Sequence, residues 1–140
     1  MRIVILSVVV SLVVISLVSV LLLSTLYTED APSVVTDIIQ EPDIVMPTKS
    51  SRPGCEEDNA CYIPDVLSIP LGYTITWENQ DAAFHSVTSG VYGNATDLFD
   101  SGHMEYDQTF TYTFEYVGSF LYHCTLHPWM NGTILVTEER

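Results

Sequence analysis

Three residues with metal-binding side chains follow one another at a spacing of three along the chain: Cys124, His127 and Met130. They come directly after one predicted strand and before the next, so a tight loop can fold all three side chains around one point. Thiolate, imidazole and thioether together suit copper in either of its oxidation states. A second imidazole is needed to complete a trigonal set, and His85, on a separate predicted strand, can supply it. Taken on their own, these residues fit a copper site, a zinc site or ordinary packing.

The elements that must position these residues are predicted to be β-strands. From residue 55 onward, Tyr, Thr, Val, Phe and Ile dominate in short runs separated by Gly, Asn, Asp and Pro, which is typical of an all-β protein. Between Thr109 and Phe114, threonines alternate with aromatic residues, so one face of that strand is aromatic. The candidate strands are residues 66–69, 73–78, 84–89, 108–114, 118–124 and 132–137. Together they predict a Greek-key sandwich or barrel of about six to eight strands.

The N-terminus carries an uncharged apolar stretch from Ile3 to Leu23, interrupted only by serines. About 20 apolar residues rising ~1.5 Å each cross a hydrocarbon core of roughly 30 Å. We therefore expect an uncleaved transmembrane helix over residues 1–26, with a cleaved signal peptide as the alternative. Arg2 is the only charged residue before Glu29, and positively charged flanks stay cytoplasmic. The rest of the chain is accordingly predicted on the extracytoplasmic face of the cell membrane.

Two further parts follow the predicted anchor. Residues 27–54 contain four prolines and no sustained hydrophobic period, so we expect a flexible linker. Residues 55–140 form the predicted copper-binding domain. All 18 acidic residues follow the apolar stretch, together with only three basic residues. Such a charge repels nucleic acid and anionic headgroups, and it favours either basic partners or solubility in a salty medium.

The three cysteines divide into two kinds. Cys55 and Cys61 enclose a short polar loop, and in an oxidising compartment this spacing favours a disulfide. A second metal site that uses both sulfurs is the alternative, although no histidine lies near them in the sequence. Cys124 is then left unpaired. A lone thiol outside the cell would normally oxidise, so its presence indicates a role such as metal binding.

The stretch from Tyr122 to Met130, Y-H-C-T-L-H-P-W-M, resembles the ligand loop of the cupredoxin family, most closely that of its amicyanin and plastocyanin-like members. The amicyanin loop is similar, with the pattern Y-H-C-T-P-H-P-F-M. The resemblance covers residues 55–140 and implies one type 1 copper ion per chain. It implies that His85 and His127 bind through imidazole nitrogens, Cys124 through a thiolate, and Met130 as a weak axial ligand. The family commonly has Asn after the first histidine, where it ties the two ligand loops together, and here Ser86 stands at that place.

The resemblance also implies a function, namely one-electron transfer between a redox donor and a redox acceptor that bind transiently. Electrons are expected to enter and leave through the ring edge of His127, within an apolar docking patch formed by Leu126, Pro128 and Trp129. Four histidines cannot furnish both a blue copper site and a three-copper cluster, so we expect an electron carrier rather than an enzyme acting alone. The alternatives are copper trafficking or storage, or a component of an oxidase or nitrite-reductase-like complex in which His123 binds a second copper.

Overall fold

A computed structural model describes residues 41–138 of the chain. These residues belong to one compact unit, Gln40–Arg140. The expected anchor over residues 1–26 lies outside the described residues. Within the described part, no helix has the length and apolar character needed to cross a membrane.

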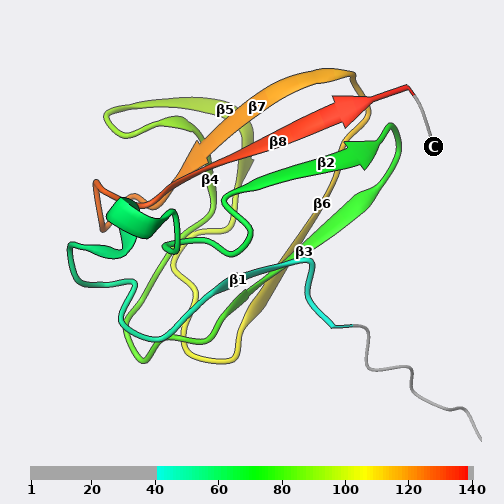
Figure 1. Ribbon diagram of the computed structural model, residues 1–140. Coiled ribbons are helices and arrows are strands. Elements are labelled where there is room, and N and C mark those ends of the chain that lie inside the picture. Colours follow the sequence, from blue (N-terminus) through cyan, green and yellow to red (C-terminus); the bar gives the residue numbers. More distant parts are fainter. Residues whose placement is uncertain (1–40, 139–140) are drawn as a thin grey trace, which may run out of the picture. The chain divides into compact units, whose positions relative to one another are not determined.

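The described unit is an all-β sandwich, as the sequence predicts, and both of its sheets are mixed (Figure 1). A three-stranded sheet has the order β1-β3-β6, and a five-stranded sheet has the order β2-β8-β7-β4-β5. In each sheet one pair is parallel, β1 with β3 and β2 with β8. The strands are β1 Ile44–Met46, β2 Val66–Pro70, β3 Thr74–Asn79, β4 Thr88–Val91, β5 Asn94–Asp100, β6 Thr109–Thr113, β7 Gly118–His123 and β8 Asn131–Thr137. A short 3-10 helix, η1 Cys55–Asp58, precedes β2.

The folded unit begins earlier than the sequence predicts, because β1 lies inside the stretch 27–54 that we expected to be a linker. The side chains of Ile44 and Met46 are fully buried, and Ile44 pairs with Trp77 in the parallel ladder. The described residues 44–54 therefore belong to the domain. A strand of three residues carries too short an alternation to be distinguished from a loop by its sequence.

The expected strand 84–89 is also displaced. Regular pairing starts only at Thr88, where β4 begins, and His85 instead forms an isolated bridge with Met104. This irregular segment leaves the histidine side chain at the end of the sandwich rather than within a ladder. The hairpin partner β5 was not predicted, because most of its residues are exposed and show no apolar alternation.

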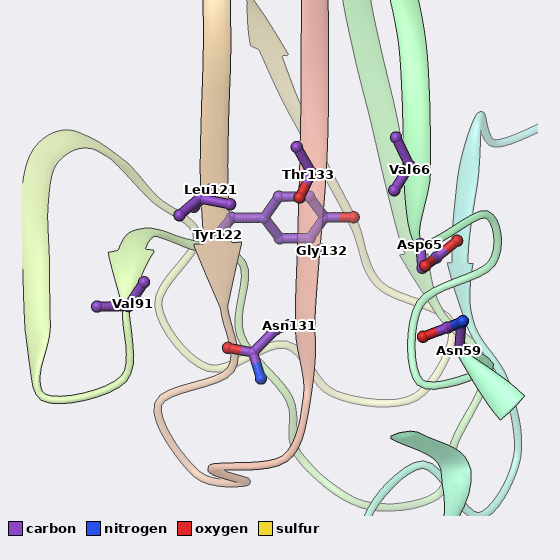
Figure 2. Close-up of a pocket in the computed structure, with 9 residues that line it drawn as sticks. All are labelled: Asn59, Asp65, Val66, Val91, Leu121, Tyr122, Asn131, Gly132 and Thr133. Carbon is purple, nitrogen blue, oxygen red and sulfur yellow. The ribbon is translucent and has the colours of Figure 1, made fainter. Parts of the chain in front are cut away.

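Aromatic side chains from both sheets fill the interior. Trp77 of β3 lies 5.8 Å from Phe110 of β6 and 5.7 Å from Tyr122 of β7, measured between ring centres. Figure 2 shows the Tyr122 ring lying across β8 at Gly132. Tyr122 is two residues before Cys124, so this packing anchors the strand that ends at the candidate metal ligands.

Candidate metal centre

Three potential metal ligands converge at one end of the sandwich. The ligand atoms of His85, Cys124 and His127 all lie within 4.8 Å of one another. The Cys124 sulfur is 3.8 Å from His85 Nδ1 and 3.5 Å from His127 Nδ1, and the two Nδ1 atoms are 3.1 Å apart. His85 and Cys124 are fully buried, whereas His127 is partly exposed. The structure thus brings together the three predicted ligands that carry a thiol or an imidazole.

The loop between β7 and β8 holds two of these side chains, and its own backbone closes it. The Cys124 N–H donates to the Met130 carbonyl at 3.1 Å, and the Met130 N–H donates to the His127 carbonyl at 2.9 Å. Met130, the fourth predicted ligand, is fully buried at the end of this loop.

His85 is oriented by a carboxylate that the sequence did not point out. Its Nε2 lies 3.2 Å from Asp81 Oδ2. Because an ionised carboxylate only accepts hydrogen bonds, Nε2 carries the proton in the neutral ring, and Nδ1 presents its lone pair to Cys124 and His127. Burial acts to raise the pKa of Asp81, but hydrogen bonds from the backbone of Ser51 and Lys49 and from His85 hold it well below its usual range.

Both histidines favour the neutral form, which is the form that binds a metal. Burial lowers the pKa of His85, although the Asp81 carboxylate partly opposes this effect. Burial also lowers the pKa of His127, and the neighbouring His85 lowers it further.

These shifts predict how the stability of the metal-free protein depends on pH. The unfolded chain takes up protons on these histidines below about pH 6.5, where the folded protein does not, so the free energy of unfolding falls as the pH drops through this range. Asp81 adds a second loss below about pH 3.9, since its folded pKa is depressed. Urea unfolding of the metal-free protein between pH 7.5 and 5.5 measures the first effect. A His85→Gln variant should show a shallower slope, and an unchanged slope would contradict this assignment.

Ser86 ties the two ligand loops together despite its short side chain. Its backbone N–H points to the Cys124 sulfur, with the nitrogen 3.4 Å away. Its hydroxyl oxygen accepts the Thr125 N–H at 2.9 Å and lies 3.0 Å from the Thr125 hydroxyl. Its carbonyl accepts the buried Tyr62 hydroxyl at 2.5 Å. Serine at this position therefore links the two loops through the backbone N–H and the hydroxyl of Thr125.

Removing this tie is expected to weaken the fold around the site. In a Ser86→Ala variant the Thr125 N–H loses its acceptor, and a hydrogen bond of this kind contributes about 0.5–1.5 kcal/mol. Chemical unfolding of the metal-free variant should show a loss of that size. Ser119→Ala, an exposed position on β7, is the matched control and should change stability by less than about 0.5 kcal/mol. Equal effects of the two substitutions would contradict the role of Ser86.

The cysteines pair as the sequence favours. Cys55 and Cys61 form a disulfide, which takes both sulfurs and removes the alternative of a second metal site there. Cys124 is free and buried. His123 lies outside the group of donors, because its Nδ1 is 3.1 Å from the Gly90 carbonyl and its ring packs edge-on against Tyr92.

Of the predicted docking residues, Trp129 packs beside the partly exposed His127, and Leu126 and Pro128 flank His127 in the chain. Leu126 is 40% exposed, Pro128 is exposed, and Trp129 is half-buried with its ring centre 5.3 Å from that of His127. Phe84, which the sequence analysis did not single out, is 52% exposed beside His85 in the chain. An aromatic residue directly before a predicted ligand in the sequence is the signal that could have identified Phe84.

The donor set fits a soft transition metal. A thiol and two neutral imidazoles with converging lone pairs are the ligands that copper and zinc prefer. His85 Nδ1 and His127 Nδ1 lie 3.1 Å apart, so one cation would accept a lone pair from each ring once both rings are protonated at Nε2.

Comparisons with known proteins place this geometry in context. No model of a protein family matches the chain. Amicyanin from Paracoccus denitrificans is 38% identical over 77 residues, which cover 54% of this chain and 57% of the amicyanin. Amicyanin from Paracoccus versutus is 35% identical over the same length, so the chain spans little more than half of these relatives. The solved structure of a purple cupredoxin from Nitrosopumilus maritimus is 33% identical, with a TM-score of 0.61, and the match covers 67% of this chain and 97% of that one.

Proposed function

The chain belongs to the cupredoxin family, and on this premise we propose that it transfers single electrons through one copper ion bound by His85, Cys124, His127 and Met130. The observation that carries the proposal is the convergence of one thiol sulfur and two imidazole Nδ1 atoms within 4.8 Å. Copper bound there would alternate between Cu(I) and Cu(II).

The surrounding residues keep the ligands in one arrangement. His85 and Cys124 are fully buried, so water has little access to them, and the loop hydrogen bonds leave the ligands little freedom to rearrange. A rigid ligand set lowers the reorganisation energy that accompanies the transfer of each electron. The Ser86 N–H stabilises negative charge on the sulfur, and hydrogen bonding at this position tunes the reduction potential of such sites.

The exposed part of the site suits brief contact with another redox protein. His127 reaches the surface within the apolar docking patch of Leu126, Pro128 and Trp129. The chain as a whole is strongly acidic, with a net charge of −14. An apolar patch on an acidic protein favours fast, weak binding of a basic partner, and such electron-transfer contacts are small.

The proposal includes a membrane anchor over residues 1–26 and an extracytoplasmic domain. The apolar stretch from Ile3 to Leu23 supports the anchor, and the disulfide between Cys55 and Cys61 is consistent with an oxidising compartment. Membranes from expressing cells test this placement. Full-length protein should resist alkaline carbonate extraction and be cleaved by protease added to the extracytoplasmic face, and release into the soluble fraction would contradict an anchor.

Electron transfer is tested by voltammetry of the copper-loaded protein together with copper analysis after repeated cycles. An electron carrier shows a reversible one-electron wave and keeps its copper in both oxidation states. Copper loss on each reduction would overturn the proposal and favour the trafficking alternative.

A further inference from the structure

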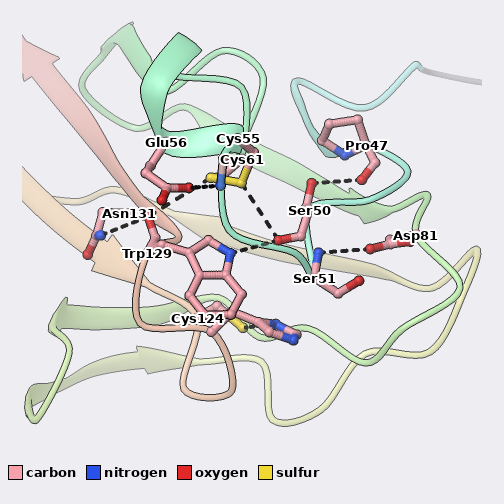
Figure 3. The surroundings of a disulfide bond; sticks show 12 residues. Pro47, Ser50, Ser51, Cys55, Glu56, Cys61, Asp81, Cys124, Trp129 and Asn131 are labelled. Atoms are coloured by element: carbon pink, nitrogen blue, oxygen red, sulfur yellow. Dashed lines mark hydrogen bonds between the residues drawn. A yellow bond between two sulfur atoms is a disulfide. The ribbon is translucent and has the colours of Figure 1, made fainter.

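Figure 3 shows two consecutive residues, Ser50 hydrogen-bonded to Trp129 and Ser51 to Asp81. Trp129 and Asp81 each lie beside one histidine of the site. The two serines lie in a turn after β1 that is fixed by its own hydrogen bonds. The Ser50 hydroxyl and N–H both donate to the Pro47 carbonyl, at 2.7 and 3.2 Å. Ser50 is only 1% exposed, so this turn is part of the packed domain.

Ser51 reaches His85 through a carboxylate. The Ser51 N–H donates to Asp81 Oδ2 at 3.0 Å, and the same oxygen lies 3.2 Å from His85 Nε2. The other carboxylate oxygen accepts the Ala82 N–H at 2.9 Å. Asp81 is thus held on both oxygens, and its position fixes which nitrogen of His85 carries the proton.

Ser50 reaches His127 through an aromatic ring. Its carbonyl accepts the Trp129 indole N–H at 3.0 Å, and the Trp129 ring packs against the His127 ring at 5.3 Å. The two sulfurs of the disulfide lie against the backbone of the two residues that make this contact, Ser50 and Trp129. Cys55 Sγ lies 3.7 Å from the Ser50 carbonyl oxygen, and Cys61 Sγ lies 3.9 Å from the Trp129 carbonyl oxygen.

We propose that Ser50 and Ser51 form a single brace that sets the orientation of both histidines, with Asp81 and Trp129 as the positioning residues through which it acts. The proposal rests on the proposed copper function and adds to it. The contact from Ser51 to Asp81 and the contact from Ser50 to Trp129 start from adjacent residues of one fixed turn, so a movement of Asp81 also shifts Trp129. The brace therefore couples the buried histidine to the partly exposed one through a part of the chain that binds no metal itself.

Three variants test the brace: Asp81→Asn, Trp129→Phe and their combination. Asn keeps the size of Asp but turns an NH₂ group toward a donor, so the hydrogen bonds that Asp81 accepts from Ser51, Ala82 and His85 cannot all form. Phe keeps an aromatic ring beside His127 but lacks the pyrrole part of the indole and, with it, the N–H that binds Ser50. The matched controls are Asp97→Asn and Tyr116→Phe, which change an exposed carboxylate and an exposed phenol.

The first readout uses the metal-free protein. Nitrogen-15 NMR of the wild type should show His85 protonated at Nε2 in a single ring state, and Asp81→Asn should give a mixture of tautomers. Both controls should retain the wild-type pattern. A wild-type ring that already exchanges between tautomers would overturn the brace without bearing on copper.

The second readout is copper affinity, with the reduction potential and the copper hyperfine splitting measured alongside. Loss of an outer partner of a ligand costs about 10–100-fold in metal affinity, which is the range expected for Asp81→Asn. Loss of one neutral hydrogen bond in Trp129→Phe is expected to cost roughly 2–10-fold. The fold-loss of copper affinity in the double variant should be smaller than the product of the two single fold-losses, because either substitution already loosens the shared turn.

The outcomes separate the brace from the copper site itself. A wild type without a type 1 spectrum would refute the proposed function. If the wild type has that spectrum, two results would refute the brace. One is a double variant whose loss of copper affinity equals the product of the two single losses. The other is a reduction potential and a hyperfine splitting that remain unchanged in all three variants.

Discussion

A Cys124→Ser variant is expected to lose the intense visible colour of the copper protein together with its narrow copper hyperfine splitting. Both properties come from the short bond between copper and a thiolate, and a serine hydroxyl stays protonated and cannot replace that ligand. The loss of affinity should exceed the ~10–100-fold that removal of an outer partner causes, since a direct ligand is removed. Absorption and electron paramagnetic resonance spectra recorded with Cu(II) measure the effect.

The matched control for this variant is His103→Gln. His103 is an exposed potential ligand that lies outside the group of three converging donors. The control should keep the absorption band and the copper stoichiometry of the wild type. A Cys124→Ser protein that retains the band would show that the copper is held elsewhere.

The second large effect is expected from Gly132→Ala, which changes the packing beneath the ligand loop. A Cβ atom at position 132 would lie 2.2 Å from Tyr122 Cζ and 2.3 Å from its hydroxyl oxygen. The Tyr122 ring cannot move aside, because it is 1% exposed and packs edge-on against Tyr62 at 4.8 Å and Trp77 at 5.7 Å. Overpacking of this kind costs about 1–3 kcal/mol and sometimes more.

Urea unfolding of the metal-free protein measures this cost, with Thr133→Ala at the adjacent, half-buried position of β8 as the control. We expect the alanine at position 132 to lower the free energy of unfolding by at least about 2 kcal/mol and the control by under about 1 kcal/mol. Equal stabilities of Gly132→Ala and the wild type would mean that the Tyr122 ring does not occupy the place described here.

The sequence predicts the ligand loop well because its chemistry is concentrated in a few residues. Cys124, His127 and Met130 lie on one loop between two strands, so their proximity needs little knowledge of the fold. The alternation of threonine and aromatic residues likewise identifies β6, since one face of this strand lines the core. The sequence could assign His85 to the same site as the loop only because the site lacked a second imidazole and His85 could supply it.

The parts that support the site could not be predicted, because they depend on contacts between distant residues. The hydrogen bond from Trp129 to Ser50 joins residues 79 positions apart, and the one from Ser51 to Asp81 joins residues 30 positions apart. Neither serine belongs to a motif. The three-residue strand β1, which brings this turn to the site, is too short to show a period.

The most direct test of the copper site uses the folded unit Gln40–Arg140, which retains β1 and the turn that follows it. The metal-free protein is titrated with Cu(II) while the visible absorption and electron paramagnetic resonance spectra are recorded. We predict that one copper ion binds per chain with an intense thiolate-to-copper band and a narrow hyperfine splitting. A pale, ordinary Cu(II) spectrum, or saturation at a different stoichiometry, would contradict a type 1 copper held by His85, Cys124 and His127.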